Sequence, residues 1–381
     1  MGAAGPVPTA FISSSGELGG AEGILLSVLE GVGPGWATEV IVLGDGPLVD
    51  RIRALGIPVA VVRERRRIGL AAAAFDAWRL LRRSRARVVH ANGVRAALVA
   101  ALGGGGGRPV LWYRMDTSRD GLLGDLIARR CRLIVGLSAS VNDRFRDRLP
   151  ERLRVVNPGV RERRVDLVAA RERVRRRIGS SADAAVIVVA ARLSPPKGQM
   201  DAIEALARVR EDRPEAQLAL LGSETRGFPC YRAALLERAA DLDVARAVHF
   251  LGSMTVDEAT DFVAGCDVLL APSRYDPASG WREGFGLSAV EAMSVRTPVV
   301  AYRHGSFPEV LGECARFADE GDVAALAAEV ARLFSDPELR ERLAACGASL
   351  AQRYRPERTV AEIKACYREI GGEPADDPTR R

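Results

Sequence analysis

The sequence predicts an α/β protein with two doubly wound parallel sheets, one in each half of the chain. Short β-branched or aliphatic runs alternate with helix-length amphipathic segments along most of its 381 residues. This alternation is typical of strand–helix–strand units. Several runs are continuously apolar, as expected of parallel strands covered by helices on both faces. The length is sufficient for two domains with separate cores.

The strand candidates follow one another in regular order. In the first half they lie at 9–14, 38–44, 58–62, 87–93, 109–114, 132–138 and 154–159. In the second half they lie at 185–192, 217–223, 247–252, 267–273 and 298–303. Most end on Gly, Ser, Asn or Arg, and ligands of open α/β sheets bind at the carboxyl ends of the strands. We therefore expect the functional groups to lie in the loops that follow these strands.

Charge and composition divide the chain into segments. We expect an N-terminal domain over 1–160, a highly charged linker and surface helix over 161–184, and a second domain over 185–352. A helix within 353–371 is expected to pack back on the first domain, and 372–381 to be a disordered tail.

The composition excludes several classes of protein. The six cysteines are scattered without a Cys-x-x-Cys pair and the three histidines are isolated, which favours reduced thiols in a cytoplasmic protein and neither a disulfide framework nor a metal site. No signal peptide or membrane-spanning run is apparent. The net charge of +6 comes almost entirely from arginine, and no basic run is interleaved with aromatic residues, so we expect no nucleic-acid partner.

The stretch "EGFGLSAVEAM" places two carboxylates around a small glycine turn. Glu283 comes before the turn, and Glu291 lies one turn into the helix that Leu287 begins. The first N–H groups of a helix lack internal partners, and Gly286 permits a ligand to approach them closely. A diphosphate suits such a position, and a carboxylate beyond it suits sugar hydroxyls. For an isolated pair, two solvated glutamates on a helix surface remain the alternative.

The stretch "ARLSPPKG" supplies two cations after a buried strand. Arg192 ends the strand, and Lys197 lies in a turn just before a helix. Lys197 is one of only two lysines in the chain. Ammonium and guanidinium groups at such a loop are suitable phosphate partners, with a solvated loop cation as the alternative.

Two glycine-containing strand ends are weaker signals. Gly16, Gly19 and Gly20 follow the first strand but do not form G-x-G-x-x-G, so the nicotinamide fingerprint is absent. Gly252 ends another strand, in "HFLG". A ligand-contacting and a purely structural role both remain open for these glycines.

Taken together, the motifs resemble the retaining glycosyltransferase family four, which has the GT-B fold of two Rossmann-like domains facing a central cleft. The matching pieces are in the family's order and cover nearly the whole chain. They are "GELGGAE", "VVHANG", "LSASVNDRF", "VVNPGV", "ARLSPPKG", "VHFLGSM" and "EGFGLSAVEAM…TPVVAYRHGSFPEVL". Glu283 and Glu291 match the family's most specific mark, the E-x7-E pair.

The resemblance implies a role for each candidate residue. Arg192 and Lys197 would neutralise the diphosphate of a nucleotide-sugar donor, Glu291 would hold the ribose hydroxyls and Glu283 the donor sugar. The remaining donor-side positions, assigned through backbone groups, are Gly19, Gly20, Gly252, Phe285, Gly286 and Leu287. The resemblance also implies same-face attack by an acceptor hydroxyl, with no metal and no cofactor.

Two departures from the family pattern bear on the site. Where the family often has a histidine after the fifth strand, this chain has Met115, and we name Asp116 beside it as a site residue. The segment 274–282 is inserted before Glu283; its Tyr275 and Trp281 shape a sugar or acceptor subsite, or the segment is a longer surface loop.

The sequence thus predicts a retaining, metal-independent hexosyltransferase that uses a UDP- or GDP-sugar and a glycan, lipid-linked or small natural-product acceptor. The alternatives are a nucleotide-sugar epimerase of related fold and a catalytically inactive binding subunit. The basic segment 63–87 is either a weak peripheral contact with the inner face of the membrane or a solvated helix face.

Overall fold

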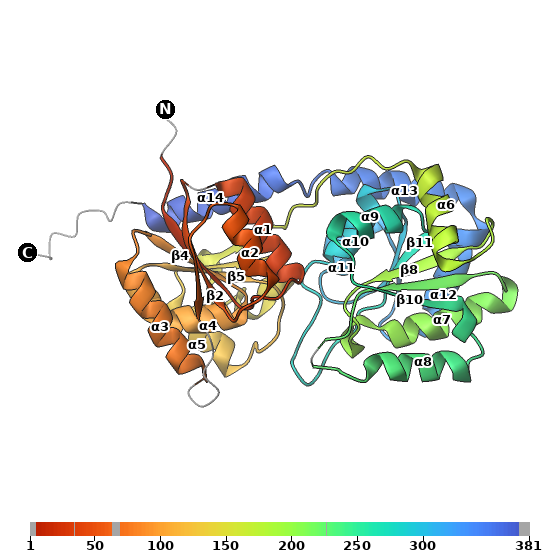
Figure 1. Ribbon diagram of the computed structural model, residues 1–381, viewed down its shortest axis with the longest axis horizontal. Helices are drawn as coiled ribbons and strands as arrows, with labels where there is room; N and C mark the ends of the chain where they lie inside the picture. Colours follow the sequence, from red (N-terminus) through yellow and green to blue (C-terminus); the bar gives the residue numbers. More distant parts are fainter. Residues whose placement is uncertain (1–4, 34, 63–68, 226, 373–381) are drawn as a thin grey trace, which may run out of the picture. The chain divides into compact units, whose positions relative to one another are not determined.

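The computed structural model describes residues 5–33, 35–62, 69–225 and 227–372. The chain forms two compact units (Figure 1). Unit 1 consists of Met1–Gly159 together with Pro356–Arg381, and unit 2 of Val160–Arg355.

Unit 1 contains a seven-stranded sheet in the order β3-β2-β1-β4-β5-β6-β7, and every neighbouring pair is parallel. The strands are β1 Thr9–Ser13, β2 Ala37–Leu43, β3 Val59–Val62, β4 Val88–Asn92, β5 Val110–Arg114, β6 Leu133–Gly136 and β7 Leu153–Val155. The helices are α1 Gly20–Val32, α2 Pro47–Ala54, α3 Gly69–Arg83, α4 Val94–Leu102, α5 Leu122–Arg130 and α14 Pro356–Gly371, with 3₁₀ turns η1 Gly104–Gly107, η2 Ser140–Phe145 and η3 Pro150–Arg152.

Unit 2 contains a six-stranded sheet in the order β10-β9-β8-β11-β12-β13, again parallel throughout. The strands are β8 Val186–Ala190, β9 Gln217–Leu221, β10 Val248–Gly252, β11 Val268–Ala271, β12 Val299–Tyr302 and β13 Arg316–Ala318. The helices are α6 Leu167–Ile178, α7 Gln199–Asp212, α8 Tyr231–Asp241, α9 Val256–Ala264, α10 Leu287–Ser294, α11 Phe307–Leu311, α12 Val323–Ser335 and α13 Pro337–Ala351, with 3₁₀ turns η4 Pro195–Lys197, η5 Ala245–Ala247 and η6 Gly312–Cys314.

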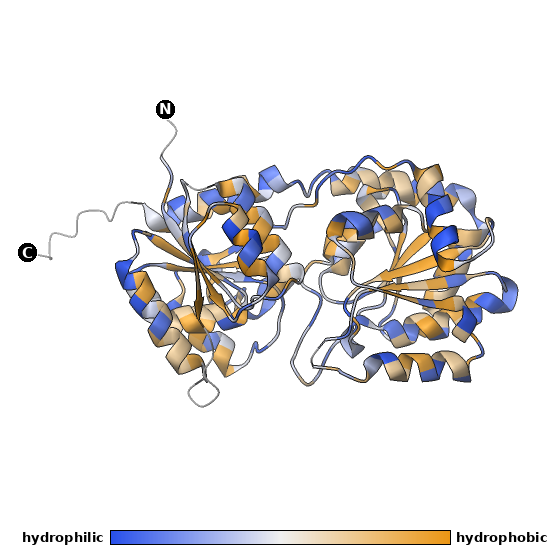
Figure 2. Ribbon diagram, in the orientation of Figure 1, coloured by the Kyte–Doolittle hydropathy of each residue, from blue (hydrophilic) through white to orange (hydrophobic). Residues whose placement is uncertain are grey.

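The predicted class, two doubly wound parallel-sheet α/β units, is confirmed. The central strands are buried along their whole length, as in β1, β4 and β5, because helices cover both faces of a parallel sheet. Figure 2 shows apolar strands in both sheets beneath helices of mixed polarity. Each of the twelve strand candidates overlaps an observed strand.

The strand β13 was not predicted. It has only three residues and follows η6, so it is too short to give a recognisable period in the sequence. Its place in the sheet comes from pairing with β12, which it extends at the edge.

The expectation of reduced cysteines was wrong for one pair. Cys314 and Cys346 form a disulfide between residues 32 apart in sequence, with 5.2 Å between their Cα atoms. The packing of α13 beside η6 creates this proximity, which scattered sequence positions do not reveal. Of the free cysteines, Cys131, Cys266 and Cys366 are buried and Cys230 is exposed.

The two segments beside the domain boundary each pack within a unit. In the segment 161–184, α6 buries Arg175, which donates hydrogen bonds to the carboxylate of Asp267 at 2.6 Å and to the carbonyl of Ala184 at 2.8 Å. In unit 1, α14 lies along α1 (Figure 1), and Tyr367 is hydrogen-bonded to His90 of β4 at 2.8 Å. The predicted disordered tail and the basic run 63–68 lie outside the described residues, apart from residue 372.

Candidate functional site

The strand order of unit 2 predicts where a ligand lies. The order reverses at β8, whose neighbours are β9 on one side and β11 on the other. In doubly wound sheets, ligands bind outside the carboxyl ends of the strands at this switch point. The loops that leave β8 and β11 carry Lys197 and Glu283. These candidates are therefore at the expected edge of the sheet.

The two loops approach each other at Gly198. This residue is the N-cap of α7 with φ +70°, and a Cβ there would lie 1.9 Å from the carbonyl oxygen of Pro272. Glycine adopts this conformation without strain, and its lack of a Cβ permits the close approach. The backbone N–H of Arg274 also donates to the carbonyl of Pro196 at 2.9 Å. Close contact between the loops thus brings Lys197 beside the segment that contains Glu283.

Lys197 and Glu283 form a half-buried ion pair. The distance from Nζ to Oε2 is 2.7 Å, and the side chains are 18% and 14% exposed. The same carboxylate oxygen accepts a hydrogen bond from Ser273 Oγ at 3.3 Å. Burial alone would raise the pKa of Glu283, but Lys197, His304 and Ser273 together lower it. Glu283 is therefore ionised at neutral pH.

The glycine turn after Glu283 begins α10. Gly286 has φ +82° at the helix N-cap position, and no side chain caps the helix. A Cβ there would lie 2.4 Å from the ring of Phe307, so both conformation and space require glycine. Phe285 is buried and packs edge-on against Tyr354. This contact fixes the turn. The backbone N–H groups of Phe285, Gly286 and Leu287 are suited to binding an anion.

Glu291 lies one turn into α10 and is half-buried. Burial raises its pKa to about 7, and no described cation offsets that shift. Among the described residues we find no hydrogen bond to its carboxylate. The group is therefore close to its titration midpoint at neutral pH and is available for hydroxyl donors.

Arg192 and Gly252 belong to the same edge of the sheet. Arg192 is exposed, and its carbonyl accepts a hydrogen bond from the side chain of Gln199 at 2.9 Å. Gly222 N–H donates to the carbonyl of Gly252 at 2.8 Å. A Cβ at Gly222 would lie 2.1 Å from the carbonyl of Ala191, which shows how closely the ends of β8, β9 and β10 approach one another.

The other predicted site residues lie in unit 1. Gly19 is the N-cap of α1 and Gly20 its first residue. The carboxylate of Asp116 accepts hydrogen bonds from the N–H of Ser118, at 2.8 Å, and from its hydroxyl. Beside it, Arg114 is buried against the rings of Trp112 and Phe145.

Sequence reasoning missed two residues that support Glu283. His304 Nε2 accepts a hydrogen bond from the backbone N–H of Glu283 at 3.3 Å, and its Nδ1–H donates to Glu320 at 2.7 Å. Burial lowers the pKa of His304 although Glu320 opposes the shift, so the ring is neutral at pH 7. The available signal was a polar residue close to the end of a buried strand, since His304 lies two residues after β12.

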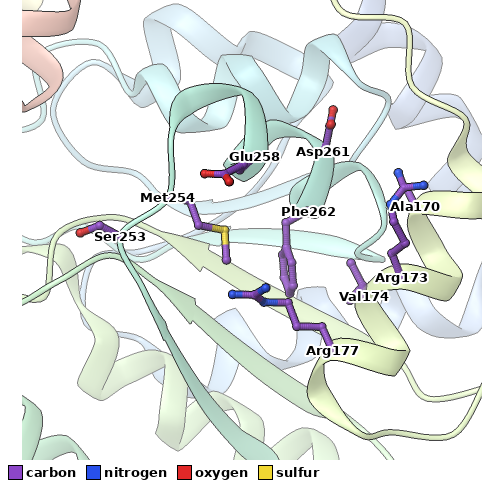
Figure 3. Close-up of a pocket in the computed structure, with 9 residues that line it drawn as sticks. All are labelled: Ala170, Arg173, Val174, Arg177, Ser253, Met254, Glu258, Asp261 and Phe262. Atoms are coloured by element: carbon purple, nitrogen blue, oxygen red, sulfur yellow. The ribbon is translucent and has the colours of Figure 1, made fainter.

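A separate hollow of about 410 Å³ lies between α6 and α9 of unit 2 (Figure 3). The side chains of Met254, Phe262 and Arg177 line it, and none of the predicted site residues does. It therefore does not alter the assignment of the site at the switch point.

The described residues also bear on metal binding and on membrane insertion. No group of three or more His, Cys, Asp or Glu that could hold a metal ion occurs within them. No helix in this part of the chain has the length and apolar character needed to cross a membrane.

The chain is similar in sequence to known glycosyltransferases. Residues 170–349 match the family model of glycosyl transferases group 1. A D-inositol 3-phosphate glycosyltransferase of Acidothermus cellulolyticus is 33% identical over 238 residues, 61% of this chain and 51% of that protein. A GDP-mannose-dependent alpha-(1-6)-phosphatidylinositol monomannoside mannosyltransferase of Mycolicibacterium smegmatis is 37% identical over 180 residues, 47% of this chain and 45% of that protein. The chain thus spans about half the length of these relatives.

Solved structures agree on the fold. HepE of Anabaena in complex with UDP-glucose has a TM-score of 0.83 at 24% identity, covering 95% of this chain and 100% of that one. WaaG, a glycosyltransferase involved in lipopolysaccharide biosynthesis, has a TM-score of 0.71 at 17% identity, covering 96% of this chain and 100% of that one. The fold is that of the GT-B class. Residues 170–349 are thus similar to the glycosyl transferases group 1, in agreement with the resemblance of the motifs.

Proposed function

We propose that the protein transfers a sugar from a UDP- or GDP-sugar to an acceptor hydroxyl with retention at the anomeric carbon. The observation that carries this proposal is the Lys197–Glu283 pair beside an uncapped helix start at the switch point of unit 2. The names of the relatives support a nucleotide-sugar donor, since one is GDP-mannose-dependent and HepE was solved with UDP-glucose.

The donor diphosphate would occupy the helix start. Lys197 and Arg192 would neutralise it together with the N–H groups of Phe285, Gly286 and Leu287. Charge develops on this group as it leaves, so donors that are already in place lower the barrier. Glu291 would accept hydrogen bonds from the ribose, and Glu283 from the donor sugar.

The proposed transfer requires only the donor and the acceptor as reactants. The bond between the sugar C1 and the β-phosphate oxygen breaks, and a bond from C1 to the acceptor oxygen forms on the same face. The acceptor proton passes to the departing phosphate. We propose that this step needs no metal ion, because Lys197, Arg192 and the helix start supply the positive charge. Transfer that persists in excess EDTA supports this point, and transfer that is lost in EDTA and restored by Mg²⁺ or Mn²⁺ contradicts it.

The acceptor would be a glycan, a lipid-linked sugar or a small natural product. A thermal-shift screen with UDP, GDP, ADP and TDP and their sugars identifies the donor, and product analysis with acceptor panels then tests transfer. Epimerised nucleotide sugar without transfer would instead identify an epimerase. Nucleotide binding without sugar release from any donor would indicate an inactive binding subunit.

We also propose a cytoplasmic location with weak peripheral membrane contact through 63–87. In the described part of this segment, Phe75 and Trp78 of α3 stack at 5.6 Å and are 60% and 39% exposed. Exposed aromatic side chains near arginines suit an anionic lipid surface. Sedimentation with anionic vesicles should fall in the Phe75→Ala/Trp78→Ala variant. Equal sedimentation of the two proteins would favour a solvated helix face.

A further inference from the structure

The inserted segment 274–282 is an ordered hairpin. Asp276 pairs with Trp281 as an antiparallel bridge, and its N–H donates to the carbonyl of Trp281 at 3.1 Å. The carboxylate of Asp276 closes the turn by accepting hydrogen bonds from the N–H of Ala278 and the hydroxyl of Ser279. At its base, the N–H of Tyr275 donates to Glu320 at 2.7 Å. The position of Trp281 is thus fixed by hydrogen bonds at both ends of the hairpin.

Trp281 is in contact with the cation of the site. Lys197 Nζ lies 4.5 Å from the centroid of its ring. The Trp281 ring also contacts the ring of His304. The two ring centroids are 6.1 Å apart, and the angle between the ring planes is 30°. His304 is hydrogen-bonded to the backbone of Glu283 and to Glu320. The same carboxylate, Glu320, therefore holds both the hairpin and the histidine against which Trp281 packs.

Lys197 consequently has two partners that differ in kind. Glu283 binds the ammonium through charge and neutralises it. The face of Trp281 attracts the ammonium through its quadrupole and leaves the full positive charge available to an anion. In the proposed reaction, Glu283 contacts the donor sugar and Lys197 the diphosphate. Of these two contacts of Lys197, only the one with Glu283 uses a group that the donor sugar would also bind.

We propose that Trp281 is the positioning residue of Lys197, holding its ammonium over the diphosphate seat while the nucleotide sugar is bound. The inference rests on the proposed function, because it assigns Lys197 to the diphosphate. The purely structural alternative is that Trp281 only packs against His304 and shapes the hairpin. Under that alternative, the effect of replacing Trp281 depends on the size of the new side chain. It does not depend on an aromatic face or on the charge of Lys197.

The test is a double-mutant cycle read on nucleotide affinity. Trp281→Leu keeps bulk and removes the aromatic face, whereas Trp281→Phe keeps a smaller one. Titration calorimetry with UDP or GDP, whichever the unmodified protein binds, should show about 3–30-fold weaker binding in Trp281→Leu and a smaller loss in Trp281→Phe. In a Lys197→Met background the effect of Trp281→Leu should vanish. Phe334→Leu, which removes the remote contact with Arg213, is the matched control and should not alter affinity.

The outcomes separate the two proposals. Equal losses in Trp281→Leu and Trp281→Phe, or an undiminished effect in the Lys197→Met background, overturn the positioning role. Sugar-transfer assays on the unmodified protein test the function independently. A protein that binds UDP or GDP and shows the coupling but transfers no sugar retains the inference and loses the function. A protein that binds neither nucleotide overturns both.

Discussion

Lys197 is the residue on which the proposed chemistry depends most. It forms an ion pair with Glu283 and lies on the ring of Trp281, and it is largely shielded from water. An ammonium in such a place interacts more strongly with a developing negative charge than an exposed one does, because the local dielectric is lower. The same shielding means that its loss leaves Glu283 without a counter-charge.

We expect Lys197→Ala to lower turnover by about 10²-fold or more, because it removes stabilisation of the leaving group. Steady-state kinetics with the identified donor measures the effect. The matched control is Lys364→Ala, which removes the only other lysine, in α14 of unit 1. Turnover of Lys197→Ala close to that of the control would exclude Lys197 from the mechanism.

Glu291 should make nucleotide affinity depend on pH. Its folded-state pKa is raised to about 7 by burial, so the ionised form, the better acceptor for ribose hydroxyls, is lost as pH falls through that value. Affinity for UDP or GDP should be about 10-fold weaker near pH 6 than near pH 8. Calorimetry at several pH values measures this step.

Glu291→Gln serves as the control for titration of the nucleotide phosphate itself. It should bind more weakly than the unmodified protein at high pH and lack the Glu291 step. Glu291→Ala should cost about 1–3 kcal/mol of binding free energy through lost charged hydrogen bonds. A pH profile identical in the unmodified protein and Glu291→Gln would remove Glu291 from the ribose site.

The elements around α10 are held by a covalent link. The disulfide joins η6 to α13, and Gly347 of α13 lies so close to Met293 of α10 that a Cβ there would be 2.8 Å from Cγ. The helix that carries Glu291 therefore packs directly on a helix whose position the disulfide restricts.

Removing this link should destabilise unit 2. For a loop of 32 residues, Cys346→Ser is expected to lower the free energy of unfolding by about 4 kcal/mol. Urea denaturation monitored with and without reductant measures it. Cys230→Ser replaces an exposed free cysteine and should leave the midpoint unchanged. Identical midpoints for the two variants would show that the disulfide does not contribute.

All described strands except β13 were predictable, and the supporting contacts were not. Continuously apolar runs such as β8 and β11 can lie only between two helical layers, so their composition identified them. The ion pair of Lys197 with Glu283, 86 positions apart, was not predicted, because the resemblance assigned Lys197 to the diphosphate and Glu283 to the donor sugar. His304 and Glu320 are joined to the site only by tertiary contacts. The ordered hairpin at 274–282 likewise depends on Glu320, a residue that its own sequence does not include.

At the scale of the molecule, both sheets have the same reversal of strand order. The glycine loop of unit 1 follows β1, the strand at which that order reverses, as Lys197 follows β8 in unit 2. Gly19, Gly20 and Lys197, which the sequence predicts as site residues, therefore all follow a strand at which the order reverses. The sugar, base and acceptor were not predictable, because backbone groups and loop geometry select them.

Unit 1 should be unable to fold from its first 159 residues alone. Without α14, the aromatic cluster of Phe11, Trp36 and His90 loses Tyr367, which packs against all three. A fragment of residues 1–159 should show no cooperative thermal transition, whereas a fragment of 160–355 should show one. A cooperative transition in the first fragment would contradict this dependence on α14.

The return of α14 to unit 1 also affects the order in which the two units can complete their folding during synthesis. The chain passes into unit 2 at residue 160 and back at 356, so unit 2 is contiguous and unit 1 is not. Domains ordinarily fold as they emerge from the ribosome, the N-terminal one first. Here the first unit to be synthesised is the last to be completed. The apolar surface that α14 covers in unit 1 remains uncovered throughout the synthesis of unit 2. Association with chaperones during translation should therefore be greatest for nascent chains that end before residue 356.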